Sequence, residues 1–279
     1  MRYLRFFVLA LVVLSTLAAG CASLETKQRE WIFQPSNRTW GGVVSTDGFE
    51  DVWITFDSPI TEQTERLHGV WLPAADAAQA PVLLYLHGAR WNVYGSANRI
   101  RRMQELGFSV LAIDYRGFGQ SSGKLPSEDM AAEDAMAAWN WLGTQYPGTP
   151  RYIFGHSLGG AIAIDLAQRV QDEQGTLVEG TFTSIADVVK TFWWGWLPVS
   201  GLITQKFESE RKVAQVGSPL LVVHGTADRL IPIDLGRKLY DAAQEPKRFV
   251  QVDGGSHHNT NAVGQPLYRQ ALREMFGWP

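Results

Sequence analysis

Residues 151–167 read RYIFGHSLGGAIAIDLA, in which an apolar run, a Gly-x-Ser-x-Gly motif and an alanine-rich segment follow one another. This order predicts a strand, a sharp turn and a helix, with Ser157 at the turn. Glycines are expected beside the serine because a Cβ would clash there, and the helix N-terminus favours negative charge that develops near the hydroxyl. A bare Gly-x-Ser-x-Gly also occurs in ordinary glycine-rich turns. The strand and helix around it make Ser157 a candidate nucleophile.

Short apolar runs separated by helix-length segments lie on both sides of this motif. Two alternating segments, 51–56 and 66–73, are typical of half-buried antiparallel strands. Runs of Val, Ile and Leu without alternation are typical of strands buried on both faces of a parallel sheet. These runs are 82–88, 109–115, 151–157, 177–183, 219–225 and 248–254, with helix-like stretches at 93–106, 127–146, 158–172 and 233–244. The pattern predicts one doubly wound α/β domain with its site at the carboxyl ends of the strands.

The composition of the chain agrees with a single large globular domain. Of its 279 residues, 45% are hydrophobic and 19% charged. Without a short N-terminal segment, about 250 residues remain, which is enough for a well-buried core. The formal net charge of −3 gives no electrostatic reason to expect a nucleic-acid partner.

A serine nucleophile needs a general base, and the base needs an acid that orients it. The run 219–225 leads into a loop with Asp228, although Asp is also favoured in turns for local hydrogen bonds. The run 248–254 leads into a loop with adjacent His257 and His258. Two adjacent rings cannot easily face one ion, and no spaced Cys/His cluster accompanies them, so we expect no metal site.

Backbone N–H groups are expected to stabilise the oxyanion that forms when the serine attacks a carbonyl. One donor should be Leu158, directly after the nucleophile, and the other Ala89, which follows the apolar run 82–88. His87 is expected to brace this loop, and His156 needs no chemical role.

The N-terminus has the pattern of an export signal, with Arg2 and Arg5 before an apolar run over 6–14 and then small residues. The run is short for a membrane span, yet an uncleaved anchor helix is the alternative.

The single cysteine, Cys21, follows LAAG and resembles the lipobox of bacterial lipoproteins, although Ala18 stands where a larger aliphatic residue is usual. The resemblance implies a signal peptide over 1–20, lipidation of Cys21, and an anchor in the cell envelope. Ala22 implies the outer membrane, facing the periplasm. The polar residues that follow predict a tether over 21–38.

From about residue 40 to its end, the chain resembles the α/β-hydrolase superfamily, and most of all its serine aminopeptidase-type and bud-emergence-type branch. The motifs that carry the resemblance are LHGARWN (86–92), DYRGFGQSSG (114–123), GHSLGG (155–160), TFTSIADV (181–188), HGTAD (224–228) and GGSHHN (254–259). The order Ser, Asp, His is that of this superfamily. The resemblance implies an α/β-hydrolase domain over 39–279, with a mostly parallel eight-stranded sheet flanked by helices. It also makes Arg116 a structural residue.

Two departures from the family pattern bear on the site. Family members commonly have His-Gly-Asn in the first loop, where Ala89 and Arg90 now follow His-Gly, so a side chain that could brace the loop is missing. The usual C-terminal pattern is Gly-x-x-His-Asn-Asp. Aligning from the glycine puts His257 in the catalytic place and His258 where Asn usually stands.

A short cap is expected at about 188–209, between strands six and seven, with Trp193, Trp194 and Trp196. These rings either line an apolar substrate pocket or pack on the domain and contact a lipid surface.

The resemblance implies a serine hydrolase that cleaves small-molecule carboxylic esters or thioesters through an acyl-enzyme, with no cofactor. Ser157, His257 and Asp228 would serve as nucleophile, base and orienting acid. Two alternatives share the fold: a peptidase on short peptides or cell-wall fragments, and a non-catalytic envelope lipoprotein that binds a ligand.

Overall fold

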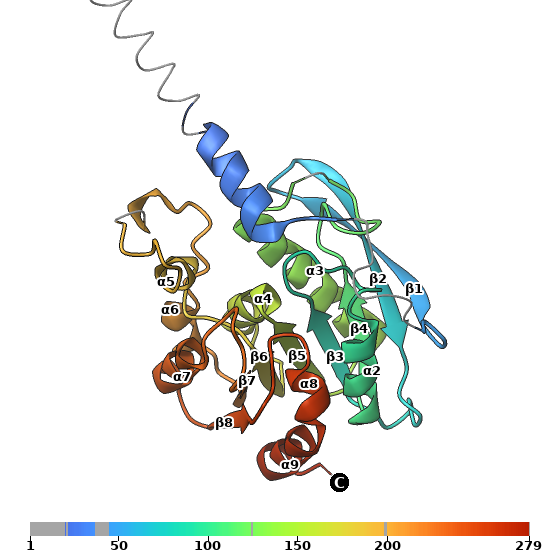
Figure 1. Cartoon of the computed structure of the whole chain (residues 1–279). Helices are drawn as coiled ribbons and strands as arrows, with labels where there is room; N and C mark the ends of the chain where they lie inside the picture. The colour runs from blue at the N-terminus through green and yellow to red at the C-terminus, as the bar shows by residue number, and fades with distance from the viewer. Residues whose placement is uncertain (1–19, 21, 37–44, 124, 198–199, 279) are drawn as a thin grey trace, which may run out of the picture.

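The computed structural model describes residues 20, 22–36, 45–123, 125–197 and 200–278, which contain one eight-stranded sheet (Figure 1). The strand order is β1-β2-β4-β3-β5-β6-β7-β8. The first two strands pair antiparallel, β2 also meets β4 antiparallel, and all other neighbours are parallel. The strands are β1 (Glu50–Ser58), β2 (Gln63–Leu72), β3 (Val82–Leu86), β4 (Ser109–Ile113), β5 (Arg151–His156), β6 (Gly175–Glu179), β7 (Leu220–Gly225) and β8 (Lys247–Val252).

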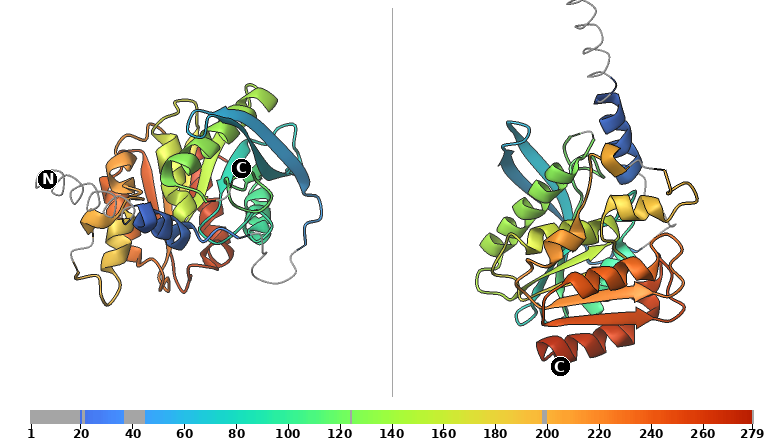
Figure 2. Two further views of the ribbon diagram at one scale, coloured as in Figure 1. Left: turned by 90° about the horizontal axis from the view of Figure 1, so that it is seen from above. Right: turned by 90° about the vertical axis from the view of Figure 1, so that its left-hand side faces the viewer.

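Helices cover both faces of the sheet (Figure 2), because successive side chains of a strand point to opposite faces. On β3, Leu84 and Leu86 pack with α3 and α4, whereas Tyr85 packs with α2 and α9. The helices are α2 (Ala97–Glu105), α3 (Glu128–Gln145), α4 (Leu158–Ala167), α5 (Ile185–Lys190), α6 (Ser209–Val213), α7 (Ile233–Ala242), α8 (Thr260–Val263) and α9 (Gln265–Phe276), with a 3-10 turn η1 (Ser200–Leu202).

This architecture confirms the predicted α/β-hydrolase fold. The expected strand at 177–183 begins earlier and ends at Glu179, because Gly180 turns the chain with a φ of +57°. The segment expected as a cap, at about 188–209, lies between β6 and β7 and contains the end of α5 and η1. No helix in the described ranges has the length and apolar character needed to cross a bilayer.

The segment predicted as a tether over 21–38 contains a helix over 22–33, drawn in blue in Figure 1. The helix docks through its C-terminal end, where Phe33 is fully buried and its ring lies 5.7 Å from that of Phe207. Nearer the N-terminus of the helix, the side-chain amide of Gln28 donates to the carbonyl of Leu202 at 2.8 Å. The side-chain oxygen of Gln28 accepts from the N–H of Thr204 at 2.9 Å. A mostly polar sequence therefore forms a helix because a few of its residues find partners far along the chain.

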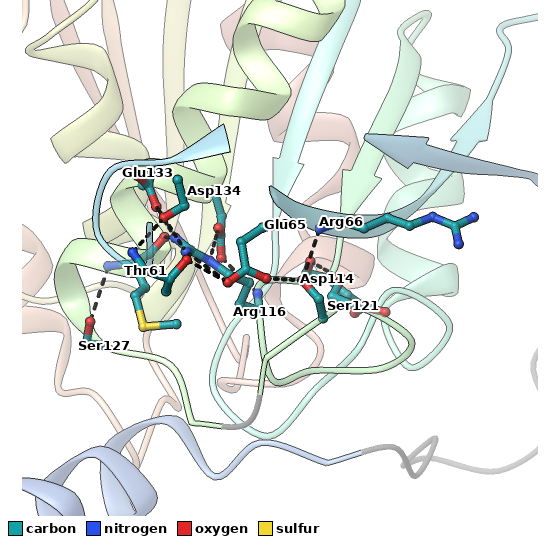
Figure 3. Close-up of polar contacts among 12 residues, drawn as sticks. Thr61, Glu65, Arg66, Asp114, Arg116, Ser121, Ser127, Glu133 and Asp134 are labelled. Carbon is teal, nitrogen blue, oxygen red and sulfur yellow. Dashed lines mark hydrogen bonds and ion pairs between the residues drawn. The ribbon is translucent and has the colours of Figure 1, made fainter. Parts of the chain in front are cut away.

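A buried ion-pair cluster around Arg116 ties the first hairpin to α3 (Figure 3). The Arg116 side chain is fully buried, and its Nε donates to Asp134 at 2.6 Å. It also pairs with Glu133, and its Nη1 donates to the Ser58 hydroxyl at 2.9 Å and lies 3.9 Å from Glu65. Because Arg116 joins β1, β2 and α3 in this way, the structure supports the structural role expected for it.

Candidate active site

Ser157 lies at a strained turn between β5 and α4. Its φ of +57° and ψ of −121° are rare for a residue with a side chain. The turn is tight enough that a Cβ on Gly155 would lie 2.2 Å from the carbonyl oxygen of Gly159. The N–H of Ser157 donates to the carbonyl of Glu179 on β6 at 2.9 Å, which fixes the turn against the neighbouring strand. The sequence-predicted strand, turn and helix are all present.

Asp228 and His257 form a hydrogen-bonded pair at the ends of β7 and β8. The Nδ1 of His257 lies 2.8 Å from Oδ2 of Asp228, and both side chains are nearly buried. The other carboxylate oxygen of Asp228 accepts from the backbone N–H groups of Leu230 at 2.9 Å and Ile231 at 2.8 Å. With Nδ1 held by the acid, Nε2 is the ring nitrogen left to work on a substrate or a serine.

The Asp228 carboxyl is held in its charged form. Burial on its own raises the pKa of Asp228, but the imidazoles of His224, 3.6 Å away, and His257, together with the N–H of Ile231, outweigh it. The pKa of Asp228 therefore lies well below its usual range. A carboxylate that stays charged at neutral pH can orient the His257 ring and stabilise its protonated form.

The structure distinguishes between the two adjacent histidines. His257 is buried and contacts Asp228, whereas the exposed His258 lies at the rim with its ring 6.2 Å from that of Trp91. Partial burial, with His257 and Arg99 nearby, lowers the pKa of His258 and favours its neutral form. Only His257 has the geometry of an oriented base.

A pocket of about 300 Å³ joins these elements. Ser157 and His257 both line it, as does Ala89 in the loop after β3. Leu158 is the first residue of α4, so its N–H belongs to the helix N-terminus beside the serine. The remaining lining residues are Gln34, Gly88, Arg90, Trp91, His156, Leu230 and His258.

Two further histidines support the site from behind. The fully buried His87 donates from Nδ1 to the carbonyl of Gly88 at 2.8 Å and so braces the loop before Ala89. His156 donates from Nε2 to the carbonyl of His257 at 3.0 Å and so fixes the backbone that carries the candidate base. Burial, with Arg99 and His257 nearby, lowers the pKa of His156 well below its usual range, so this ring is neutral.

A buried ion pair that the sequence did not predict lies behind the histidine loop. Arg99 on α2 contacts Glu179 at 2.9 Å, and the Tyr268 hydroxyl donates to the other oxygen of that carboxylate. The Arg99 guanidinium also reaches the carbonyls of His257 and His258 at 3.5 Å. A charged residue at the end of the apolar run of β6 was the available signal, since a buried Glu requires a partner.

The tryptophans of the cap lie away from the pocket. Trp193 and Trp196 are 89% and 78% exposed, and Trp194 stacks on Phe192 at 5.5 Å. Trp194 instead lines an apolar groove of about 220 Å³ between the cap and the N-terminal helix, with Trp31 and Leu202. Of the two readings left open by the sequence, the structure therefore excludes these rings from the lining of the Ser157 pocket.

The described part of the chain holds no group of three or more His, Cys, Asp or Glu side chains placed to bind one metal ion. Cys21, predicted to be lipidated, lies outside the described residues.

Comparison with known proteins assigns the chain to a family. A family model described as serine aminopeptidase, S33, matches residues 77–209. An uncharacterized protein of Mycobacterium tuberculosis, MT2364, is 36% identical over 216 residues, which cover 76% of this chain and 75% of that protein. This chain belongs to the α/β-hydrolase superfamily.

A lipase and an esterase extend the comparison. The lysophosphatidylserine lipase ABHD12 of Danio rerio is 31% identical over 216 residues, 70% of this chain and 56% of that protein. The esterase Pf2001 of Pyrococcus furiosus has the same fold with a TM-score of 0.69, at 21% identity over 87% of this chain and 98% of the esterase. This α/β-hydrolase is a serine hydrolase.

Proposed function

We propose that this serine hydrolase cleaves carboxylic esters or thioesters through an acyl-enzyme, with Ser157 as nucleophile, His257 as base and Asp228 as orienting acid. One observation carries the proposal: Ser157 and His257 line one pocket, and the Nδ1 of His257 lies 2.8 Å from Asp228. This is the arrangement that a serine needs, because its hydroxyl is a poor nucleophile at neutral pH.

In the first half-reaction the Oγ of Ser157 attacks the acyl carbon while Nε2 of His257 takes the hydroxyl proton. The tetrahedral oxyanion accepts hydrogen bonds from the N–H groups of Ala89 and Leu158. His257 then returns its proton to the departing alcohol or thiol, which leaves the acyl group on Ser157. In the second half, water attacks that ester, His257 takes a proton from the water, and Ser157 recovers it as the acid departs.

The lining of the pocket favours an ester over a free amino terminus. No carboxylate lines the pocket among the described residues, whereas the guanidinium-bearing Arg90 does. An aminopeptidase must hold a positively charged substrate group, and such a group would meet a cation here. ABHD12 is named as a lipase and Pf2001 as an esterase, which also supports ester substrates.

Labelling with a fluorophosphonate tests the proposal, because the probe reacts with an activated serine. The native protein should label within minutes and Ser157→Ala should not. Ser256→Ala, a serine of the histidine loop, serves as a control that keeps the label. A folded native protein that takes no label would support the non-catalytic alternative.

A substrate panel then separates esterase from peptidase. Nitrophenyl esters and thioesters of increasing acyl length are compared with an aminoacyl nitroanilide and a short peptide. Turnover of the esters and thioesters with little hydrolysis of the amides is expected. The reverse order would favour the peptidase alternative.

We also propose that the protein is lipidated at Cys21 and anchored to the outer membrane, facing the periplasm. The sequence around Cys21 supports this, and so do exposed apolar side chains beside the helix that follows it. Trp31 on that helix is 51% exposed, close to a cap that exposes Trp193, Trp196 and Leu202. Aromatic rings favour the membrane interface.

The anchor is tested by expressing Cys21→Ser and separating membrane from soluble fractions. The variant should move to the soluble fraction while the native protein stays with the outer membrane. Retention of the variant in the membrane would instead support an uncleaved N-terminal helix.

A further inference from the structure

The loop that carries Ala89 is strained and is held by the segment at the end of the N-terminal helix. Arg90, next to Ala89, has a φ of +69°, in the left-handed region that residues with side chains rarely adopt. Gln34, which follows the N-terminal helix, has a φ of +48°. Both residues line the same pocket as Ser157, whose own φ is positive. Strain of this kind persists only where surrounding contacts hold the backbone in place.

Three hydrogen bonds join the two strained segments. The N–H of Arg90 donates to the carbonyl of Phe33 at 2.8 Å. The Arg90 guanidinium donates twice to the side-chain oxygen of Gln34, from Nε at 3.0 Å and from Nη2 at 2.6 Å. Planar recognition through two N–H groups fixes orientation as well as distance.

The other side of this junction is anchored in the core. Phe33 is fully buried, and its ring lies 6.5 Å from that of Phe118 and 5.7 Å from that of Phe207. The carbonyl of Phe33 is therefore a fixed point, and the backbone of Arg90 is bound to it. Ala89 sits between this fixed point and Gly88, which His87 holds from the opposite side.

We propose that Gln34 is a positioning residue for the oxyanion loop. By holding the Arg90 side chain while Phe33 holds its backbone, Gln34 keeps the N–H of Ala89 aimed at the oxyanion. The N-terminal helix thereby supplies a brace that this chain lacks within the loop, where Ala89 and Arg90 follow His-Gly. The inference rests on the proposed function, because it requires an oxyanion to form beside Ser157.

The brace is tested with three variants of the full-length protein. Gln34→Ala removes the acceptor, Gln34→Glu keeps an oxygen for Arg90, and Gln28→Ala is the matched control. Gln28 is a glutamine of the preceding helix, and it bonds to the cap at Leu202 and Thr204. Kinetics on a short nitrophenyl ester, inhibition by a trifluoromethyl ketone that forms a tetrahedral adduct, and thermal unfolding are measured for each.

Gln34→Ala should lower kcat by about tenfold with KM nearly unchanged, since a misplaced donor weakens the transition state more than the ground state. The affinity for the ketone should fall by a similar factor. Gln34→Glu should recover most of the kcat, and Gln28→Ala should keep it.

A kcat of Gln34→Ala equal to that of Gln28→Ala would overturn the proposal, as would a rise in KM alone. A general loss of stability is separated from the brace by the melting temperature and by the ketone, because partial unfolding lowers the active fraction without changing the affinity of the rest. Failure of the proposed function gives a different result, since native protein would then not react with a fluorophosphonate.

Discussion

The cluster around Arg116 and the pair of Asp228 and His257 are both buried polar groups near the carboxyl edge of one sheet, yet they are built differently. In the cluster, Arg116 is bound by Asp134, Glu133 and other acceptors on every side. In the site, Asp228 binds one nitrogen of the imidazole, and that imidazole lines a pocket with Ser157. The cluster joins elements of the fold, whereas the site leaves one nitrogen of the imidazole available for the proposed reaction.

The pKa values of the carboxyls in the two regions are shifted in opposite directions. Burial raises the pKa of Asp134 to about 7, against the lowering effect of Arg116. Burial also acts on Asp228, but two imidazoles and the backbone N–H of Ile231 hold its pKa well below the usual range. Burial alone does not decide the charge of a carboxyl; the number of donors around it does.

The largest effect is expected at the base. His257→Ala should lower kcat by about 10⁴- to 10⁶-fold, because the serine loses its proton acceptor. His258→Ala should lower it by less than about tenfold, since this ring lies at the rim. Steady-state kinetics on a nitrophenyl ester check both. If only His258→Ala lost turnover, the assignment of the base would be wrong.

Loss of the acid should be the next largest effect. Asp228→Asn should lower kcat by about 10³- to 10⁴-fold with the fold retained, because the amide favours the wrong tautomer of His257. Circular dichroism checks the fold and ester kinetics the rate. A variant with native kcat would remove Asp228 from the proposed machinery.

The Arg116 cluster should respond in stability rather than in rate. Arg116→Met leaves buried carboxyls without their cation and should lower the free energy of unfolding by about 3–5 kcal/mol. Its folded fraction should keep kcat within about threefold. Arg116→Lys, which retains the charge, is the matched control and should lose less. A large fall in kcat for folded Arg116→Lys would contradict a purely structural role.

The last prediction concerns the dependence of stability on pH. The pKa of Asp134 lies above its unfolded value of about 3.9, so its contribution to stability is complete below about pH 4 and is lost as the pH rises towards 7. The pKa of Asp228 lies below that value, so its contribution is present above about pH 4 and is lost on acidification.

Urea unfolding from pH 3 to 8 measures this difference in sign. The stability of the native protein relative to Asp134→Asn should fall by up to about 1.4 kcal/mol per pH unit between the two pKa values. Relative to Asp228→Asn, it should rise from pH 3 to 5. Parallel curves for the two variants would refute the contrast between the carboxyls.

The sheet and most of the site could be predicted because their signals are local. The glycines on either side of Ser157 predict the turn. The ends of the apolar runs predict the positions of Asp228 and the histidine pair to within a residue or two. The sequence alone could not decide between His257 and His258 without an alignment to the glycines. In the structure, the contact with Asp228 distinguishes them.

The N-terminal helix could not be predicted, because the residues that hold it in place are far away in the sequence. Residues 22–38 are mostly polar, and Phe33 finds its aromatic partners at Phe118 and Phe207 only after folding. The hydrogen bonds between Gln34 and Arg90 likewise join two segments that have no common sequence pattern. The exposure of Trp193 was equally undetermined, because aromatic residues favour both pockets and interfaces.

The N-terminal helix is synthesised before the sheet, but it can dock only late. Gln28 bonds to Leu202, 174 residues away, and the candidate base arrives still later, on the loop after β8. Contacts this distant in sequence form slowly, because a long loop has to close before they stabilise anything. In the proposed mechanism, an unfinished chain therefore carries a serine with neither its base nor its complete oxyanion loop. A chain that crosses a membrane before it folds would thus stay chemically silent until its last strand is in place.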